Sequence, residues 1–565
     1  MWKIILVVTF MAIVLITYHL LTKNNKKLKR LRQEWETGNF QILDEPIQSV
    51  SSYWANKKNS QSNYDGIDQL TWDDLAMDEV FRKLNYTQSS VGSEYLFNQL
   101  RDINPSLAQV QNNEELYILL AGDSELREEL LLVLSGLGKR NYTNSSSFFF
   151  EEQSEKIKHA SMYVLLAVLP ILSVFLLFYS LKYGLVILFG SFLVNTIIYY
   201  RNKSMLASDL LSVSYVAAII QAAKSLASVN HTEFKPYANE FKEKVRPLKK
   251  ILTLTKIVAF GKDGGGEFDF LFEYIRILFL LDFISYNKII KTVATHKEEY
   301  RHIWERIGEL DAAIAVAFYH KSLDTYCTPI FSNQEEISFK KMAHPLIDKP
   351  VTNTSTLGKS TLITGSNASG KSTYIKAIAI NAILAQTIHT VLAEKWTMKP
   401  SYIATSMAIQ DNVLDGDSYF IAEIKSLQRI TRLIEEGKPC ISFIDEILKG
   451  TNTIERIAAS AAMMEWLSMN KGINVIASHD IELTEMARHS YTNYHFRESI
   501  EDGEIRFDYT VHSGPSTTKN AIKLLGMLGY PASITEKANG LAEHFTERRE
   551  WEGIGWANGL LDKLN

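Results

Sequence analysis

A glycine-rich loop in the last third of the chain has the residue types and the spacing of a phosphate-binding loop. The segment Gly365–Ser372 fits the pattern G-x-x-x-x-G-K-[ST]. It lies between an apolar strand candidate, Thr361–Thr364, and a predicted helix from Thr373 to about Leu384. Glycines let backbone N–H groups approach phosphate oxygens, and the N-terminus of the following helix adds a favourable dipole. The strand–loop–helix order therefore predicts a nucleoside triphosphate site.

Two side chains of this loop have chemistry beyond the backbone cradle. Lys371 is expected to place a positive charge on the β- and γ-phosphates, and the Ser372 hydroxyl is expected to ligate Mg²⁺. The other residues expected to contact the nucleotide are Gly365, Ser366, Asn367, Ala368, Ser369, Gly370 and Thr373.

Acidic residues follow a second strand candidate, Cys440–Ile444. Asp445 is suited to holding Mg²⁺, directly or through water, and Glu446 to orienting or deprotonating the attacking water. By themselves two acids after a strand are more often a solvated strand end, but the upstream loop favours the functional interpretation. A third strand candidate, Val475–Ser478, ends at His479, whose ring can reach a γ-phosphate; the alternative is a purely structural histidine.

The elements around these residues indicate a parallel α/β sheet. From about Ser338 short β-branched runs alternate with helical patterns, whereas residues 33–158 and 201–330 are mostly helical in pattern. Four charged residues interrupt the apolar run Phe268–Ile284, which predicts an amphipathic core helix. The predicted fold is an α/β P-loop ATPase domain, with a parallel sheet and flanking helices, preceded by an all-α region and transmembrane helices.

Composition narrows the class of protein. The 565 residues include 60 Lys and Arg against 64 Asp and Glu, for a net charge of −4. With 46% hydrophobic and 22% charged residues the chain is of ordinary globular composition. Disordered and collagen-like chains and uniformly basic nucleic-acid coats are excluded. The two cysteines, Cys327 and Cys440, are too few for a disulfide framework.

Three apolar stretches of 18 residues each are long enough to span a bilayer: Ile4–Leu21, Met162–Tyr179 and Tyr183–Tyr200. Basic residues follow the first stretch and flank the pair formed by the other two. The C-terminal end of the first stretch and both outer ends of the pair are therefore predicted to face the cytoplasm. We predict an uncleaved N-terminal anchor and a transmembrane hairpin, in a multi-pass protein of the cytoplasmic membrane with a cytoplasmic ATPase domain. The alternative for the hairpin is a buried pair of core helices.

Four sequence segments resemble the ATPase domain of the MutS proteins of DNA mismatch repair. They are "TGSNASGKSTYIKAIA", "DGDSYFIAEIKSL", "FIDEILKGTNTIER" and "IASHDIELTEMA", in the family's order and approximate spacing between Gly365 and Thr484. Upstream, "GELDAAIAVA" and "AHPLI" resemble the end of the family's helical core and the start of its ATPase domain. The resemblance extends over roughly Gly92 to Phe545 and is specific beyond about Gly308.

The resemblance implies ATP and Mg²⁺ as ligands and a role for each matching residue. Asn367, Lys371 and Ser372 correspond to the phosphate loop, Asp445 and Glu446 to the metal and water-activating acids, and His479 to a switch histidine. Ser418 matches a serine that one protomer offers to the nucleotide of the other, although by itself it would be a plain helix cap. Gln410 and Asp411 match a sensing loop, and Gln410 is also a candidate for the metal site. His512 matches a histidine that packs on adenine. Val351 stands where the family has an aromatic residue on the opposite side of the adenine.

The domain organisation departs from the family at the N-terminal side. We expect a transmembrane anchor over 1–22, a helical lever-like region over 23–158, the hairpin over 159–200, a helical core over 201–335, the ATPase domain over 336–545 and a short tail over 546–565. The stretch before Gly92 is too short for the family's mismatch-reading domain and its connector, so we expect that domain to be absent.

Two functions remain open at this point. The first is a homodimeric, membrane-anchored MutS-like ATPase that acts on DNA, as the resemblance implies. The second is an ATP-driven switch for membrane assembly or scaffolding that acts on protein partners without DNA. The basic run Lys242–Lys250 is compatible with DNA, but Glu240 and Glu243 dilute its charge.

Overall fold

The computed structural model describes residues 25–38, 44–61, 66–103, 107–151, 160–203, 207–259, 269–366, 369–407, 419–501, 504–516 and 521–552. The chain divides into two compact units. The helical unit comprises residues 1–66, 78–324 and 386–389, and the sheet unit comprises residues 67–77, 325–385 and 390–565. The predicted N-terminal anchor over 1–22 lies outside the described residues.

The helical unit is built around the long helix α17, Lys297–Ser322, most of whose second half is buried. Trp304 of α17 is fully buried, stacks on Tyr53 at 4.5 Å between ring centroids, and donates its indole N–H to Ser145 Oγ at 2.9 Å. Burial of such aromatic surface with its polar atom satisfied fixes the packing of the surrounding helices. Besides a helix over 25–37 these are α2 Ile47–Val50, α3 Ser52–Ser60, α5 Met77–Leu84, α6 Ser90–Arg101, α7 Leu107–Gly122, α8 Ser124–Leu137, α9 Ser147–Phe150, α12 Ala207–Leu226, α13 Lys235–Val245 and α14 Lys249–Ala259.

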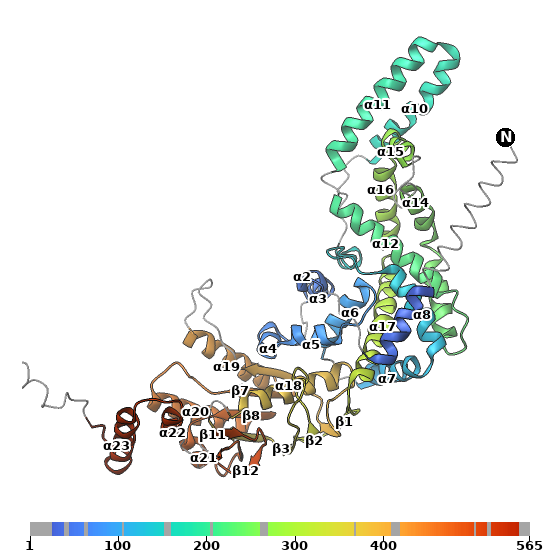
Figure 1. Ribbon diagram of the computed structural model, residues 1–565. Helices are drawn as coiled ribbons and strands as arrows, with labels where there is room; N and C mark the ends of the chain where they lie inside the picture. The colour runs from blue at the N-terminus through green and yellow to red at the C-terminus, as the bar shows by residue number, and fades with distance from the viewer. Residues whose placement is uncertain are drawn as a thin grey trace, which may run out of the picture. The chain divides into compact units, whose positions relative to one another are not determined.

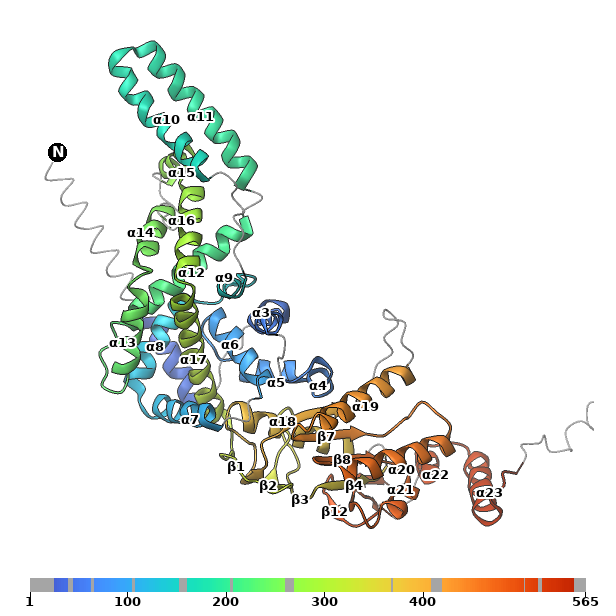
Figure 2. The same cartoon turned by 180° about the vertical axis from the view of Figure 1, so that it is seen from behind.

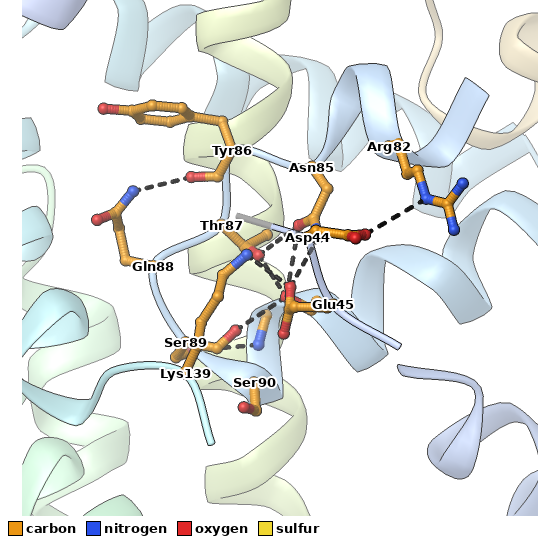
Figure 3. Close-up of polar contacts among 12 residues, drawn as sticks. Asp44, Glu45, Arg82, Asn85, Tyr86, Thr87, Gln88, Ser89, Ser90 and Lys139 are labelled. Atoms are coloured by element: carbon orange, nitrogen blue, oxygen red, sulfur yellow. Dashed lines mark hydrogen bonds and ion pairs between the residues drawn. The ribbon is translucent and has the colours of Figure 1, made fainter. Parts of the chain in front are cut away.

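A buried carboxylate fastens the segment before α2 to the rest of the helical unit. Glu45 is 7% exposed, and one of its oxygens, Oε2, accepts a hydrogen bond from Asn85 Nδ2 at 2.9 Å (Figure 3). The same oxygen accepts a hydrogen bond from Ser93 Oγ at 2.7 Å. Lys139 Nζ lies 2.7 Å from the same oxygen and supplies the opposite charge. A buried carboxylate needs such partners because an unpaired one would be strongly destabilising.

Helices α10, Ala160–Tyr179, and α11, Leu181–Lys203, form an antiparallel hairpin that extends away from the other helices of its unit (Figures 1 and 2). Both are long and apolar enough to cross a membrane, and only 17% of each apolar window is buried. The 20 residues of α10 correspond to about 30 Å of helix. The buried side chains of the hairpin include Ala167, Ser173, Ser191 and Asn195, whereas many large apolar side chains, such as Leu165 and Leu193, are exposed.

The run Phe268–Ile284 is predicted as one helix, but from Asp269 on, where the structure describes it, it is divided between two helices. Helix α15, Asp269–Leu278, ends in a turn, and α16, Leu281–Thr295, begins after Leu280, which has a left-handed φ of 48°. The turn lets Asp282 meet Arg276 at 2.8 Å and accept a hydrogen bond from the Tyr199 hydroxyl of α11, also at 2.8 Å. These contacts between distant segments outweigh the local helical pattern.

The sheet unit contains a six-stranded sheet in the order β12-β9-β4-β8-β7-β6. All neighbouring pairs in it are parallel except β12 and β9, which are antiparallel. This confirms the predicted parallel sheet. Its strands are β4 Ser360–Thr364, β6 Tyr402–Ser406, β7 Cys440–Asp445, β8 Ile473–Ser478, β9 Thr492–His495 and β12 His512–Ser513.

Two smaller sheets complete the strands of this unit. A four-stranded sheet has the order β1-β5-β2-β3, and a two-stranded hairpin pairs β10 with β11. Their bounds are β1 Ile330–Phe331, β2 Ile337–Met342, β3 Asn353–Leu357, β5 Lys395–Met398, β10 Glu498–Glu501 and β11 Glu504–Phe507.

Helices accompany the parallel strands, as α/β units require. Residues of α19, α20 and α21 join the central strands in one hydrophobic core, which includes Leu427, Ile430, Ile444, Met464, Ile476 and Leu483. A helix from far upstream, α4, covers the edge strand β6: Asp74 accepts hydrogen bonds from Thr405 Oγ1 at 2.6 Å and from the Met407 backbone at 3.0 Å. The helices of this unit are α4 Gln69–Asp74, α18 Lys371–Thr387, α19 Tyr419–Glu435, α20 Thr453–Met469, α21 Ile481–Met486, α22 Ala521–Met527 and α23 Ala532–Arg548.

Candidate nucleotide-binding site

The glycine loop connects the end of β4 to the start of α18, and two of its glycines have backbone conformations that other residues rarely adopt. Gly365 has φ +146°, and a Cβ there would lie 2.9 Å from both Phe496 O and Ser369 Oγ. Gly370 has φ +100°, and a Cβ there would lie 3.0 Å from the Tyr509 ring. Conformation and close approach both require glycine at these two positions, as the motif predicts.

Lys371 is folded back onto the loop. Its side chain is buried, and Nζ donates to the carbonyl oxygens of Gly365 at 2.5 Å and Ser366 at 2.8 Å. Burial lowers the pKa of Lys371, and the nearby carboxylates Glu446 and Asp445 oppose this shift. The ammonium group is therefore held beneath the loop, within electrostatic reach of both acids that sequence analysis had paired with it.

The acid pair stands at the end of β7, beside β8. Asp445 is the last residue of β7 and lies opposite Ala477 of β8. Glu446 has a positive φ of 69°, and its backbone N–H donates to Ala477 O at 2.9 Å, which turns the chain away from the strand at this residue. In the strand order only β8 separates β4 from β7, so the glycine loop and the acids are roughly 10 Å apart at the same sheet edge.

Glu446 and His479 form a charged hydrogen bond across the ends of β7 and β8. Glu446 Oε1 lies 2.7 Å from His479 Nδ1, and Lys449 Nζ lies 3.7 Å from Glu446 Oε2. Burial alone would raise the pKa of Glu446, but the hydrogen bond to His479 and the charges of Lys449, His479 and Lys371 outweigh it, so that pKa is lowered. The same hydrogen bond raises the pKa of His479 against the effect of burial. Glu446 is therefore ionised at neutral pH.

The donor set at this edge suits a magnesium ion held by few protein ligands. Ser372, half-buried, and Thr373, exposed, are the second and third residues of α18. Within the described residues, no three His, Cys, Asp or Glu side chains gather to hold a metal. Magnesium at phosphate sites takes one or two protein oxygens together with phosphate oxygens and water. Ser372 and Asp445 meet that smaller requirement.

Residues near the loop come from a segment far along the chain. Asn353 donates to Tyr509 O at 3.1 Å and accepts from the Val511 N–H at 2.8 Å, which joins the start of β3 to the start of β12. His512 of β12 hydrogen-bonds Asp508 at 2.9 Å. Val351, two residues before Asn353, is 45% exposed. The segments that carry Val351 and His512, the two residues predicted to pack on the adenine base, are thus neighbours.

Several predicted residues fall outside the described part of the structure. Asn367 and Ala368 of the loop belong to this group, as do the sensing-loop candidates Gln410 and Asp411 and the trans-acting candidate Ser418. The adjoining Ser366 and Ser369 are described: Ser369 Oγ donates to Ser366 O at 2.7 Å, and Ser366 Oγ to Glu498 at 3.2 Å.

Sequence analysis missed three side chains that border the site. The Tyr509 ring packs against Gly370, as described above, and is 47% exposed. Glu423 of α19 is 2% exposed and accepts a hydrogen bond from the Lys449 N–H at 3.0 Å, which ties α19 to the loop after the acid pair. Arg456 of α20 donates two hydrogen bonds to the carboxylate of Asp480, from Nη2 at 2.7 Å and from Nε at 3.1 Å, next to His479.

Comparison with known proteins identifies the family of this unit. Residues 361–546 match the family model of MutS domain V. Over these residues the chain is similar to the MutS family. Its mixed α/β architecture, with helices around a mainly parallel sheet, fits a MutS domain V.

Relatives within the MutS family extend the match upstream of domain V. The chain is 26% identical to DNA mismatch repair protein MutS 2 of Haloarcula marismortui, over 46% of this chain and 30% of that protein. It is 27% identical to DNA mismatch repair protein MutS of Lactobacillus delbrueckii, over 50% and 34%, and 29% identical to that of Thermus thermophilus, over 47% and 32%. The chain thus spans about a third of the length of these relatives.

Proposed function

We propose that this protein is a membrane-anchored ATPase of the MutS family that binds and hydrolyses ATP with Mg²⁺. The observation that carries the proposal is the geometry of the sheet unit. Lys371 lies beneath a loop that requires glycine at positions 365 and 370. The ionised Glu446 lies near enough to oppose the lowering of the pKa of Lys371. A cation, backbone donors and a carboxylate base at one sheet edge are the parts that phosphoryl transfer to water needs.

In this proposal each residue has a defined part. Loop N–H groups and Lys371 hold the β- and γ-phosphates. Ser372 and Asp445 hold the magnesium ion, which supplies positive charge to the phosphates when bound. Glu446 orients a water molecule and accepts its proton. His479, fixed by its hydrogen bond to Glu446, lies at the end of the adjoining strand, where it senses the γ-phosphate.

Base recognition in this proposal uses two segments that meet beside the loop. His512 packs on the adenine ring, and Val351 offers a small apolar contact in place of an aromatic ring. Tyr509 is suited to supply the missing aromatic surface, because its ring already touches Gly370 and almost half of the residue is exposed.

We further propose a homodimer in which Ser418 of one protomer completes the nucleotide site of the other. This part rests on the MutS family alone, as does the role of Gln410 in the metal site. Nucleotide binding would then shift the equilibrium between two arrangements of the dimer.

The membrane anchor is proposed from the hairpin. Its outward side chains are large and apolar, including Phe175 at 69% exposure and Phe178 at 89%. Neither helix has the burial expected of a soluble core helix, and the pair lies far from the N-terminus, where signal sequences lie. An apolar surface of this extent is stable only when it is covered, and a bilayer covers it without a further partner.

Aromatic side chains mark both ends of the hairpin, as is typical of interfaces between membrane and water. The exposed Tyr179 and Tyr183 lie at the tip, and the exposed Tyr200 lies near the opposite end of α11. From Tyr163 to Tyr179 α10 rises about 24 Å, which is close to the thickness of a hydrocarbon core. The N-terminal stretch Ile4–Leu21 would add a third span.

ATP turnover by the full chain in detergent tests the enzymatic proposal. The wild-type protein should hydrolyse ATP only with Mg²⁺, and Glu446→Gln should slow turnover by about 100-fold to 10,000-fold while ATP binding persists. Glu482→Gln, an exposed acid on α21, is the matched control and should turn over normally. Equal rates for Glu446→Gln and wild type would contradict the assigned base.

We propose that the ATPase acts on DNA, because the named relatives are DNA mismatch repair proteins. The alternative is an assembly switch that acts on protein partners at the membrane. The discriminating experiment measures turnover without DNA, with a perfect duplex and with a mismatched duplex. A change with either duplex supports action on DNA, and a response to the mismatch alone would establish mismatch recognition. Turnover that no DNA alters favours the alternative.

A further inference from the structure

A groove at the foot of the hairpin is lined by positive and apolar side chains. It has a volume of about 620 Å³ and lies between the first turn of α10, the start of α14 and the outer face of α16. Lys250, Lys288 and Lys291 line it, and all three are exposed. None of the described residues that line the groove is a carboxylate.

The apolar end of the groove adjoins the hairpin. Val164 of α10 and Ile284 of α16 line this end. The neighbouring residues hold the two helices together, since the rings of Tyr163 and Phe283 lie 5.2 Å apart between centroids. The groove therefore begins where the proposed membrane span begins.

The lysines lie at the depth of lipid headgroups. Measured along α16 from Ile284, Lys288 is about 6 Å away and Lys291 about 10 Å away. The headgroup layer on each side of a bilayer is roughly 5–8 Å thick. A phosphate group in that layer is therefore within reach of these side chains, while Val164 and Ile284 face the glycerol and the upper acyl chain.

We propose that this groove binds the headgroup of an anionic phospholipid, such as phosphatidylglycerol. The inference rests on the proposed anchoring of the hairpin in a membrane, and it goes beyond that function by assigning a specific lipid site. Three lysines that line one groove favour a negatively charged phosphodiester over a zwitterionic headgroup. The apolar wall beside the hairpin favours a lipid over a nucleic acid backbone, which needs only the positive charge.

Binding of a fluorescent phosphatidylglycerol to the full chain in neutral detergent tests the proposal. The variant Lys250→Gln/Lys288→Gln/Lys291→Gln should bind it on the order of 100-fold more weakly, at about fivefold for each lysine near the headgroups. The variant with arginine at the same three positions should bind as the wild type does. The matched control replaces Lys224, Lys235 and Lys321 by Gln, because these are exposed lysines of the same unit that do not line the groove, and its affinity should be unchanged.

The outcomes separate this site from the membrane anchor itself. The wild-type protein and each variant are reconstituted into vesicles of phosphatidylcholine, alone or mixed with phosphatidylglycerol. The vesicles are then washed at alkaline pH, which extracts proteins that do not span the membrane. Wild-type protein that is extracted would overturn the anchor and the lipid site together. Protein that stays in the membrane but binds phosphatidylglycerol equally well with and without the three lysines would overturn the lipid site alone. Displacement of the labelled lipid by inorganic phosphate or by a short DNA duplex would also overturn it, since the ligand would then be a free anion or a nucleic acid.

Discussion

Removal of the Lys371 side chain should abolish tight ATP binding. In the structure Nζ makes two short hydrogen bonds to loop carbonyls, at 2.5 Å and 2.8 Å, and both can be exchanged for phosphate oxygens. A hydrogen bond to a charged group contributes about 1.5–3 kcal/mol, so two contribute about 3–6 kcal/mol. Lys371→Ala should therefore weaken binding by about 100-fold to 20,000-fold.

The assay is a titration of the full chain in detergent with a fluorescent ATP analogue and Mg²⁺. Lys376→Ala is the matched control, because Lys376 lies on the same helix outside the glycine loop and should leave the Kd unchanged. Thermal unfolding of both variants checks that the sheet unit is intact. A folded Lys371→Ala protein with the wild-type Kd would refute the argument that this ammonium group binds the phosphates.

Four further predictions concern other residues of the two units. Gly365→Ala should prevent ATP binding in the titration above, because its Cβ would lie 2.9 Å from Phe496 O; binding at wild-type affinity would show that the loop tolerates a side chain. The hydrogen bond to Glu446 raises the pKa of His479, so the charged pair stabilises the fold below pH 6.5 and this contribution is lost as the pH rises through the raised pKa. Glu446→Gln should return the pKa of His479 toward 6.5 in a histidine NMR titration, and an unmoved pKa would exclude the pair. Asp311→Ala should lower the free energy of unfolding by about 2–4 kcal/mol in chemical denaturation, because the Gln88 and Ser89 N–H groups lose their acceptor; a change near zero would contradict this. Leu172→Lys, at an outward position of α10 that is 56% exposed, should reduce membrane insertion by about 2.5–3.5 kcal/mol in an insertion assay, whereas a soluble hairpin would be indifferent to it.

Features set by local sequence were predictable. The β4–loop–α18 succession follows from an apolar run, a glycine pattern and a helical pattern that adjoin one another, and Asp445 follows from the apolar run that precedes it. Parallel strands present their carboxyl ends at one edge of the sheet, so the proximity of Lys371 to the acids was also foreseeable.

Features that depend on distant partners were not predictable. The turn at Leu280 interrupts a predicted helix whose sequence contains neither glycine nor proline, and it accompanies the contacts of Asp282 with Arg276 and Tyr199. In the same way, Tyr509 reaches Gly370 and Asp74 reaches β6 only through the tertiary fold. Sequence spacing carries no information about such approaches.

The central claim is that the glycine loop and the acid pair converge on one triphosphate. An experimental structure of the full chain with a non-hydrolysable ATP analogue and Mg²⁺ tests it most directly. We predict that Lys371 Nζ leaves the carbonyl oxygens of Gly365 and Ser366 for the phosphates, with Asp445 and Glu446 facing them. A nucleotide bound elsewhere, or a loop that keeps Lys371 on its own carbonyls with the analogue bound, would contradict the claim.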